Sequence, residues 1–116
     1  MDLYGQEIIE LYKNPPHKKK LTKPTYTKSD KNESCGDKIT LYLMVDVKEK
    51  ITKASYTGTG CAISQASANI FIDEIIGQKL SNVKKIKEKE FLELLQIPIS
   101  PARKKCATLI LKTIKN

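Results

Sequence analysis

The residues best suited to chemistry in this sequence are three cysteines and one aspartate. In Ser34-Cys35-Gly36-Asp37-Lys38 a thiol and a carboxylate stand two residues apart. The glycine between them lets the backbone turn so that both side chains can face one ion. The other thiols are Cys61, directly after Gly58-Thr59-Gly60, and Cys106. Three thiolates and one carboxylate oxygen supply the four ligands of a tetrahedral metal site, so the pattern indicates a metal or sulfur site.

Each of these residues also has an ordinary structural explanation. A single cysteine is among the residues most often buried as a small apolar side chain, and an aspartate beside a glycine commonly forms a turn. The cysteines are 26 and 45 residues apart in sequence, which fits no short zinc-finger spacing. From the residues alone, a three-thiolate site and three unrelated buried thiols both stay open.

Length and composition favour one small domain with reduced thiols. We expect residues 1–116 to form a single domain, because a chain of this length buries roughly two-thirds of its unfolded surface. The odd number of cysteines, 3, argues against a closed disulfide framework. The sequence has no apolar run of about 18 residues and no signal segment at its start. We therefore expect a cytoplasmic protein that does not enter a membrane.

The chain is basic, with a formal net charge of +8 and a pI near 9.4. Lysines gather in the Lys18-Lys19-Lys20 run and in the C-terminal third, so a small nucleic-acid-binding module is one hypothesis. However, an aromatic fraction of 6% without Trp offers little for base stacking, and no recognition motif accompanies the lysines. We therefore expect no nucleic-acid partner, and we interpret the lysines and the neighbouring His17 as solvated side chains.

Hydrophobic periodicity predicts an α+β fold, a small antiparallel three-stranded sheet with helices packed on one face. Residues 17–32 are expected to be a loop or a weakly held edge with one short strand over 24–28. The other predicted elements are a helix over 3–13, strands over 38–47 and 51–57 with Gly58 and Gly60 ending the second, a buried helix over 61–76, short helices up to Pro98, and a last helix from Pro101 to about Lys115.

Every cysteine lies next to the start of a predicted element. Cys35 precedes a strand, Cys61 opens the buried helix, and Cys106 falls in the first turns of the last helix. Element ends gather at the rim of a small domain, and helix N-termini and nearby cations favour thiolates. The helical period places Cys106 on the inward face of the last helix and its lysines on the outward face, namely Lys104, Lys105, Lys112 and Lys115.

Three segments together resemble the IscU/NifU-type iron–sulfur cluster assembly scaffolds, which have a SufE/NifU-like fold. They are Asn32-Glu-Ser-Cys-Gly-Asp37, Gly58-Thr-Gly-Cys-Ala-Ile-Ser64 and Lys105-Cys-Ala-Thr-Leu109, and each carries one cysteine in the order that the family shows. Leu11-Tyr-Lys-Asn-Pro15 is similar to a helix-ending segment of the same family. The resemblance therefore extends over nearly the whole chain.

The resemblance implies a scaffold or carrier protein rather than an enzyme. On it a [2Fe–2S] cluster would be assembled with sulfur from a cysteine desulfurase and then passed to acceptor apo-proteins, and a homodimer is an expectation for the cluster-bound state. The ligands that it implies are Cys35, Asp37, Cys61 and Cys106. In the family the carboxylate at the position of Asp37 is linked to cluster lability, and the cysteine at the position of Cys106 accepts the persulfide.

Two features depart from the housekeeping members of that family. Lys105 stands where these members often carry His, so Arg103-Lys-Lys-Cys-Ala-Thr-Leu109 resembles the SufU branch, which is associated with zinc. SufU proteins usually carry an insertion between the second and third cysteines, for which 45 residues leave no room. Ile99-Ser-Pro-Ala-Arg103 matches the chaperone-recognition segment only in part. A zinc-dependent persulfide acceptor that stimulates a desulfurase therefore remains the alternative.

Overall fold

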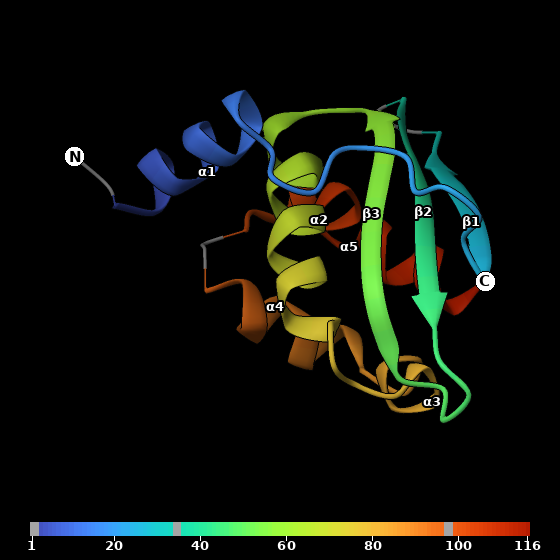
Figure 1. Cartoon of the computed structure of the whole chain (residues 1–116). Helices are drawn as coiled ribbons and strands as arrows, with labels where there is room; N and C mark the ends of the chain where they lie inside the picture. Colours follow the sequence, from blue (N-terminus) through green and yellow to red (C-terminus); the bar gives the residue numbers. More distant parts are fainter. Residues whose placement is uncertain (1–2, 34–35, 97–98) are drawn as a thin grey trace.

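The structure is a computed structural model that describes residues 3–33, 36–96 and 99–116 (Figure 1). Its elements form a three-stranded sheet with helices against one face, which confirms the predicted α+β class. Cys35, one of the four predicted ligands, lies outside the described residues. Within the described ranges, no helix is both long and apolar enough to cross a membrane.

The sheet is antiparallel throughout, with its strands in the order β1-β2-β3. The strands are β1 (Tyr26–Asn32), β2 (Asp37–Val45) and β3 (Ile51–Thr59). Strand β2 is central and alternates as its sequence predicts: Ile39, Leu41 and Leu43 are fully buried, and the residues between them are more exposed. One face of the sheet therefore belongs to the core and the other is polar.

Strand β1 is longer than the sequence predicts. It pairs with β2 over seven residues, from Tyr26 opposite Leu43 to Asn32 opposite Asp37, rather than forming a short strand over 24–28. Its inward side chains are polar, so it has no apolar alternation by which a strand is recognised. Lys28, for example, reaches α5 (Lys104–Lys115), where its Nζ donates to the carbonyl of Ile114 at 3.0 Å.

Strand β3 also continues past the point where the sequence predicts its end. The paired register includes Gly58 opposite Ile39 and Thr59 opposite Lys38. A Cβ at Gly58 would lie 2.0 Å from the carbonyl oxygen of Lys38, so the glycine allows close strand approach and does not break the strand. The expectation that Gly58 ends β3 is therefore wrong.

In Figure 1, α5 passes behind the strands, α2 and α4 lie to the left of β3, and α1 projects farther to the left. The long apolar helix α2 and the last helix α5 pack against each other and against the sheet. Residues 101–103 form a 3-10 turn with Pro101 at its start, directly before α5. The remaining helices are α1 (Leu3–Lys13), α2 (Ala62–Ile75), α3 (Leu80–Val83) and α4 (Glu88–Leu95).

The core lies between the apolar face of β2 and β3 and the inward faces of α2, α4 and α5. Phe71 of α2 and Phe91 of α4 are both fully buried, and their ring centroids are 5.2 Å apart in an edge-to-face arrangement. On α5, Ile110 and Ile114 are fully buried on the inward face, whereas its lysines are exposed as predicted. This packing fixes the first turn of α5, which carries Cys106, against the sheet.

Residues 14–25, which we call the strap, cross the open face of the sheet between α1 and β1 (Figure 1). At the outer edge of β3 the backbone N–H of Tyr56 donates to the carbonyl of His17 at 2.9 Å. Ser55 is fully buried although the register places it on the open face, which the strap crosses in Figure 1. The strap therefore adds a partial second layer on the side that the helices leave open.

The turn between β2 and β3 is joined to the end of α2 by backbone hydrogen bonds, and we call this region the hairpin end. The N–H of Ile51 donates to Gln78, the N–H of Gly77 donates to Ile51, and the N–H of Leu80 donates to Glu49, at 2.8–2.9 Å. Gly77 has a φ of +92°, so it ends the helix in the left-handed conformation that the sequence predicts. Main-chain groups thus join the turn to α2, and the side chain of Asp46 closes the turn itself by accepting from the N–H groups of Lys48 and Lys50 at 2.9 Å.

Candidate metal centre

Three of the predicted ligands meet at the opposite end of the sheet, which we call the rim. Asp37 is the first residue of β2, Cys61 directly precedes α2, and Cys106 lies in the first turn of α5. One carboxylate oxygen of Asp37 and the two Sγ atoms all lie within 4.8 Å of one another. This region is at the top of Figure 1, where β3 ends and α2 begins.

Asp37 is only 1% exposed, and its two oxygens have different surroundings. Oδ1 accepts a hydrogen bond from the backbone N–H of Cys61 at 3.0 Å. Oδ2 is buried without a hydrogen-bond partner among the described residues. A buried carboxylate oxygen without a partner costs free energy, whereas a cation beside it would compensate that cost. The orientation of Asp37 therefore suits a metal ligand better than a turn former.

Gly60 brings the backbone close to Asp37. A Cβ at this position would lie 2.6 Å from Asp37 Oδ1 and 2.5 Å from Ser64 Oγ, so no larger residue fits without displacing one of them. Ser64 is fully buried, and its hydroxyl donates to the carbonyl of Cys61 at 3.0 Å. The sequence argument placed the glycine near the site but did not identify Ser64. Its position three residues after Cys61, where a side chain can bond back to the helix start, was the available signal.

The two described thiols differ in exposure. Cys61 is half-buried at the N-cap of α2 and makes no side-chain capping bond, so its sulfur is available to a ligand. Cys106 is only 1% exposed, on the inward face of α5 as its helical position predicts. The N-terminus of α2 begins at Cys61, so the first N–H groups of this helix lie beside the rim. A metal bound at the rim would thus have one sulfur on its solvent side and one on its core side.

The structure does not describe Cys35, so its place in the site stays a prediction. The glycine that follows it has a φ of +73°, a left-handed conformation that L-residues rarely adopt. The N–H of Gly36 donates to the carbonyl of Asn32 at 2.9 Å, which closes a turn directly before Asp37. The backbone therefore turns at Gly36, as the motif predicts.

Lys105, which precedes Cys106, is exposed on the side of α5 that faces β1. There it helps to line a cavity of about 490 Å³ between the two elements, together with Lys31, Lys112 and other residues of β1 and α5. It takes part in no ion pair within the described ranges. Lys105 therefore adds positive charge beside the rim.

The structure corrects the interpretation of His17 as a solvated side chain. Its side chain is 19% exposed, and its Nε2 lies 2.6 Å from Oδ1 of Asp73 on α2. Its backbone N–H also donates to Oδ1 of the buried Asn69 at 3.0 Å. His17 therefore anchors the strap to α2, and it does not belong to the cluster at the rim.

The donor set fits a thiophilic metal. A tetrahedral ion with bonds near 2.3 Å holds its ligands about 3.8 Å apart, so separations of up to 4.8 Å need only a small closure. Two sulfurs and one carboxylate oxygen are ligands for iron or zinc rather than for magnesium or calcium. One coordination position is left for a further ligand, and Cys35 is close in sequence.

Comparison with known proteins agrees with this geometry. The family model described as NifU-like N terminal domain matches residues 3–116. The iron–sulfur cluster assembly scaffold protein IscU of Thermotoga maritima is 33% identical, with 97% of this chain and 90% of the relative aligned. The zinc-dependent sulfurtransferase SufU of Bacillus subtilis is 32% identical over 97% of this chain and 87% of the relative.

Solved structures show the same fold. A protein described as a putative iron–sulfur cluster assembly scaffold for the SUF system, from Fervidobacterium islandicum, has a TM-score of 0.76 at 30% identity, with 95% and 92% of the two chains covered. The N-terminal part of a NifU-like protein from Brucella abortus, at 19% identity, shares the fold with a TM-score of 0.75 over 97% and 90%. This chain therefore belongs to the NifU-like N-terminal domain family, whose relatives include IscU and SufU proteins.

Proposed function

We propose that this chain is a scaffold on which a [2Fe–2S] cluster is assembled and from which it passes to acceptor apo-proteins. The observation that carries the proposal is the meeting of two thiols with a buried carboxylate oxygen that has no protein partner among the described residues. Thiolates hold cluster iron, whereas a carboxylate oxygen is a harder ligand that iron in a cluster holds less tightly. Asp37 would thus let the cluster leave.

In this proposal Cys106 receives sulfur from a cysteine desulfurase. Its thiolate attacks the outer sulfur of the persulfide on the desulfurase, a new S–S bond forms, and the desulfurase cysteine leaves as a thiolate. Arg103, Lys104 and Lys105 precede Cys106 and are exposed, so they place positive charge on the surface next to this thiol. Because Cys106 is only 1% exposed, the rim must open locally for this transfer.

The remaining site residues have distinct roles in the proposal. Cys61 and Cys35 are iron ligands, and Asp37 is the exchangeable ligand. Ser64 and Gly60 position Asp37 and Cys61, the serine by its bond to the Cys61 carbonyl and the glycine by its lack of a side chain. Because Gly60 has no Cβ, Asp37 and Ser64 can keep the positions that the site requires.

A second function, a zinc-dependent sulfur acceptor that stimulates a desulfurase, is favoured by one specific observation. The three donor atoms lie close enough for a single tetrahedral ion, whereas ligands on the two irons of a cluster are spread more widely. The SufU protein of B. subtilis is named as zinc-dependent. In the sequence, Lys105 directly before Cys106 resembles the SufU branch. The alignments with this SufU protein and with the IscU protein of T. maritima run over 130 and 129 positions for the 116 residues of this chain, so both relatives carry segments without a counterpart here and alignment length does not separate the two functions.

The deciding experiment compares the metal content of freshly purified protein with its anaerobic reconstitution by iron, cysteine and a desulfurase. A scaffold develops visible sulfur-to-iron charge-transfer absorption, and Cys35→Ser, Cys61→Ser and Cys106→Ser abolish it. A zinc-dependent acceptor instead holds about one tightly bound zinc and stimulates the desulfurase without colour. Colourless protein in every reconstitution would overturn the scaffold proposal.

Two carboxylate variants complete the design. Asp37→Asn keeps the size of the side chain and removes its charge, so we expect weaker metal retention and faster loss of the cluster. Glu74→Gln makes the same chemical change on the exposed side of α2 and serves as the matched control. Equal effects of the two substitutions would exclude Asp37 as a ligand.

A further inference from the structure

The open face of the sheet carries lysines that come from separate parts of the chain. Lys38 of β2 lies on this face with Tyr42, because residues an even number of positions apart on a strand share a side. Lys53 of β3 pairs with Met44 and therefore lies on the same side. The strap, which crosses this face, adds Lys18, Lys19 and Lys20. We call these five lysines the basic face.

None of the five lysines is neutralised within the described part of the chain. All are exposed, and none takes part in an ion pair there. From residue 14 to residue 29 the sequence contains no acidic residue at all. Lys31, at the border of the face, differs because its Nζ lies 3.5 Å from Glu33. Like charges gathered without partners repel one another, so an opposite charge placed against them is favoured.

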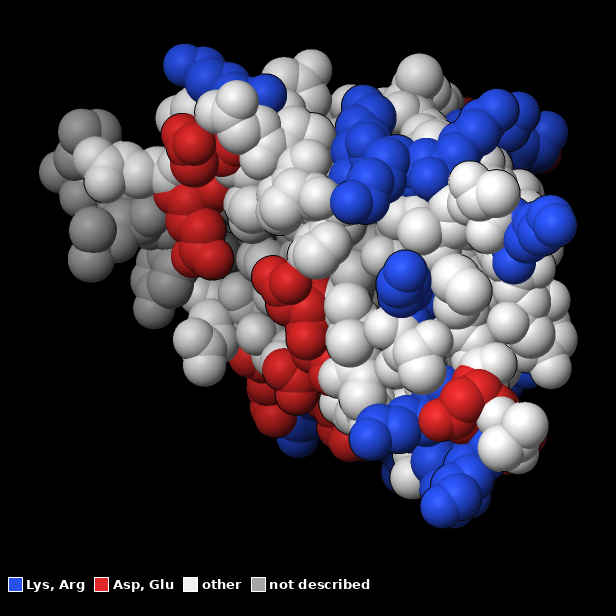
Figure 2. Space-filling model, viewed as in Figure 1, with Lys and Arg blue, Asp and Glu red and all other residues white. Residues whose placement is uncertain are grey.

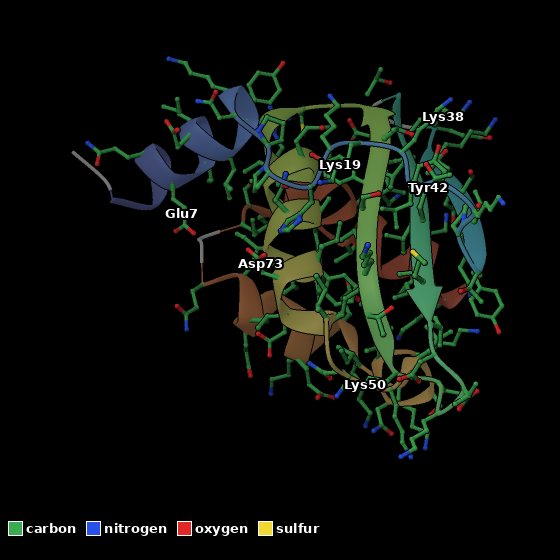
Figure 3. All side chains as sticks on the ribbon, viewed as in Figure 1. Glu7, Lys19, Lys38, Tyr42, Lys50 and Asp73 are labelled. Atoms are coloured by element: carbon green, nitrogen blue, oxygen red, sulfur yellow. The ribbon has the colours of Figure 1, made fainter. Side chains whose placement is uncertain are left out.

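Acidic side chains gather elsewhere on the molecule. Figure 2 shows them as a stripe over α1, α2 and α4, whereas blue side chains cover the strap and the start of β2. Figure 3 places Glu7 and Asp73 at the left of the view, Lys19 above and to the right of Asp73, and Lys38 farther to the upper right. The exposed acidic residues of these helices are Glu7, Glu10, Asp73, Glu74, Glu88, Glu90 and Glu93. The two surfaces would therefore attract partners of opposite charge.

The basic face borders the rim. Lys38 directly follows Asp37, and the strand register pairs it with Thr59, two residues before Cys61. A hollow of about 280 Å³ lies beside it, lined by Ser29, Asp30, Lys31 and Lys38. A protein seated on this face would thus have part of its surface close to the metal centre.

We propose that the basic face is the docking surface for an acidic acceptor protein, which it holds with the receiving cysteines of that protein next to the rim. The proposal rests on the proposed function for the cargo that is passed, but the docking itself does not need a cluster. The acidic stripe would repel the same partner from the α1–α2–α4 side, so the charges select the orientation as well as the partner.

A nucleic acid is the competing occupant, and the chemistry of the face argues against it. Most side chains between the lysines carry short hydroxyls, and Tyr42, which is half-buried, has its hydroxyl 3.2 Å from Oγ1 of Thr57. Single-stranded nucleic acid is usually held by exposed aromatic rings that stack on bases, and this face presents none. Hydroxyls and lysines on a firm sheet suit a protein surface rich in carboxylates.

The test measures binding of the apo-protein to an acidic apo-ferredoxin by fluorescence anisotropy, in the absence of metal. We expect the triple variant Lys19→Glu, Lys38→Glu and Lys53→Glu to bind at least about tenfold more weakly near 50 mM salt. The difference should shrink near 0.5 M salt, where the Debye length is roughly 4 Å. A second triple variant with Gln at the same positions should give an intermediate loss and guards against misfolding of the first.

A matched control carries the same charge change elsewhere: Lys85→Glu, Lys89→Glu and Lys115→Glu, all exposed and outside the basic face. Equal weakening by both triple variants, or no binding of the wild type, would overturn the proposal. So would tight, salt-dependent binding of a labelled single-stranded RNA with no binding of the ferredoxin. Ferredoxin binding without cluster formation would refute the proposed function and leave the docking surface intact.

Discussion

The two ends of the sheet are built from different kinds of contact. At the hairpin end, main-chain hydrogen bonds of 2.8–2.9 Å join the turn before β3 to the residues after α2. At the rim, the start of β2 is joined to the start of α2 through the side chain of Asp37, which accepts from the N–H of Cys61. At the hairpin end the side chain of Asp46 closes the turn by accepting from the N–H groups of Lys48 and Lys50, but main-chain groups make the link to α2. The link at the rim depends instead on the side chain of Asp37 and on the absence of a side chain at Gly60.

This difference suits the hairpin end to stabilising the fold and the rim to binding a ligand. The contacts of the hairpin end are satisfied within the protein, so a ligand has nothing to add there. The rim keeps a buried carboxylate oxygen without a hydrogen-bond partner among the described residues, beside two thiols. In the proposed function a metal completes these polar groups, and its binding would stabilise the folded chain.

Exchanging single glycines at the two ends should break the comparison most clearly. Gly60→Ala places a methyl group 2.6 Å from Asp37 Oδ1, so the carboxylate must move. We expect zinc or ferrous affinity to fall about 100-fold and the free energy of unfolding by about 2 kcal/mol. Chelator competition measures the first quantity and urea unfolding the second.

Gly77→Ala is the matched control at the hairpin end. A Cβ there meets nothing within 4 Å, but the φ of +92° is strained for alanine. The expected loss is about 1 kcal/mol of stability with unchanged metal affinity. If Gly77→Ala weakened metal binding as much as Gly60→Ala, the proposed division between the two ends would be wrong.

Asp37→Asn should have the next largest effect. It sharpens the comparison because it separates the stability of the apo-protein from its metal affinity at one residue. The amide oxygen can still accept from the Cys61 N–H, while the charge that has no partner disappears. We expect apo-protein stability to stay within about 1 kcal/mol of the wild type or to rise, with metal affinity about tenfold lower. Thermal unfolding with and without zinc checks both, and a strongly destabilised apo-protein would contradict the prediction.

The sequence predicted the central parts of the fold from two different patterns. Strand β2 follows from alternation with a period of two residues, and α2 follows from a long run of small and apolar residues that Gly77 ends; both are confirmed. Strand β1 was underestimated because its inward side is polar and bonds to the end of α5, as Lys28 does with Ile114. Such contacts are long in sequence separation, so no local pattern reveals them.

For the candidate site, the sequence predicted which residues take part and that they lie at the starts of helices and strands. Motif order predicted that Asp37, Cys61 and Cys106 lie together, and the structure brings them within 4.8 Å. The motifs could not predict that a side chain at Gly60 would collide with Asp37, or that the Ser64 hydroxyl donates to the carbonyl of Cys61. These depend on how two elements approach each other in space, which a single sequence does not encode locally.

Thiol alkylation tests the asymmetry within the rim itself. Cys61 is half-buried at a helix start, whereas Cys106 is only 1% exposed on the inward face of α5. We expect iodoacetamide to modify Cys61 at least about ten times faster in the folded apo-protein, because reactivity needs both thiolate character and access. Peptide mass spectrometry over time measures both rates, and added zinc should slow both. Faster modification of Cys106 would contradict the described burial.

Tyr56, between the two ends, supplies the smallest expected effect. Its hydroxyl donates to Gln65 and accepts from Asn69, so Tyr56→Phe should cost about 1 kcal/mol at neutral pH. Burial raises the pKa of Tyr56 to about 12, against an opposing influence of the hydrogen bond from Asn69.

The pH dependence of this effect has a defined sign. The raised pKa means that the folded state favours the neutral phenol, so wild-type stability is complete below pH 10 and falls as the pH approaches 12. Tyr56→Phe has no phenol at this position to ionise. The difference in free energy of unfolding between the wild type and Tyr56→Phe should therefore shrink between about pH 10 and pH 12. Urea unfolding of both proteins at neutral pH and at steps above pH 10 measures it. A stability difference that stayed constant with pH would mean that Tyr56 ionises as easily in the folded as in the unfolded protein. Water would then reach the middle of the sheet more readily than its burial indicates.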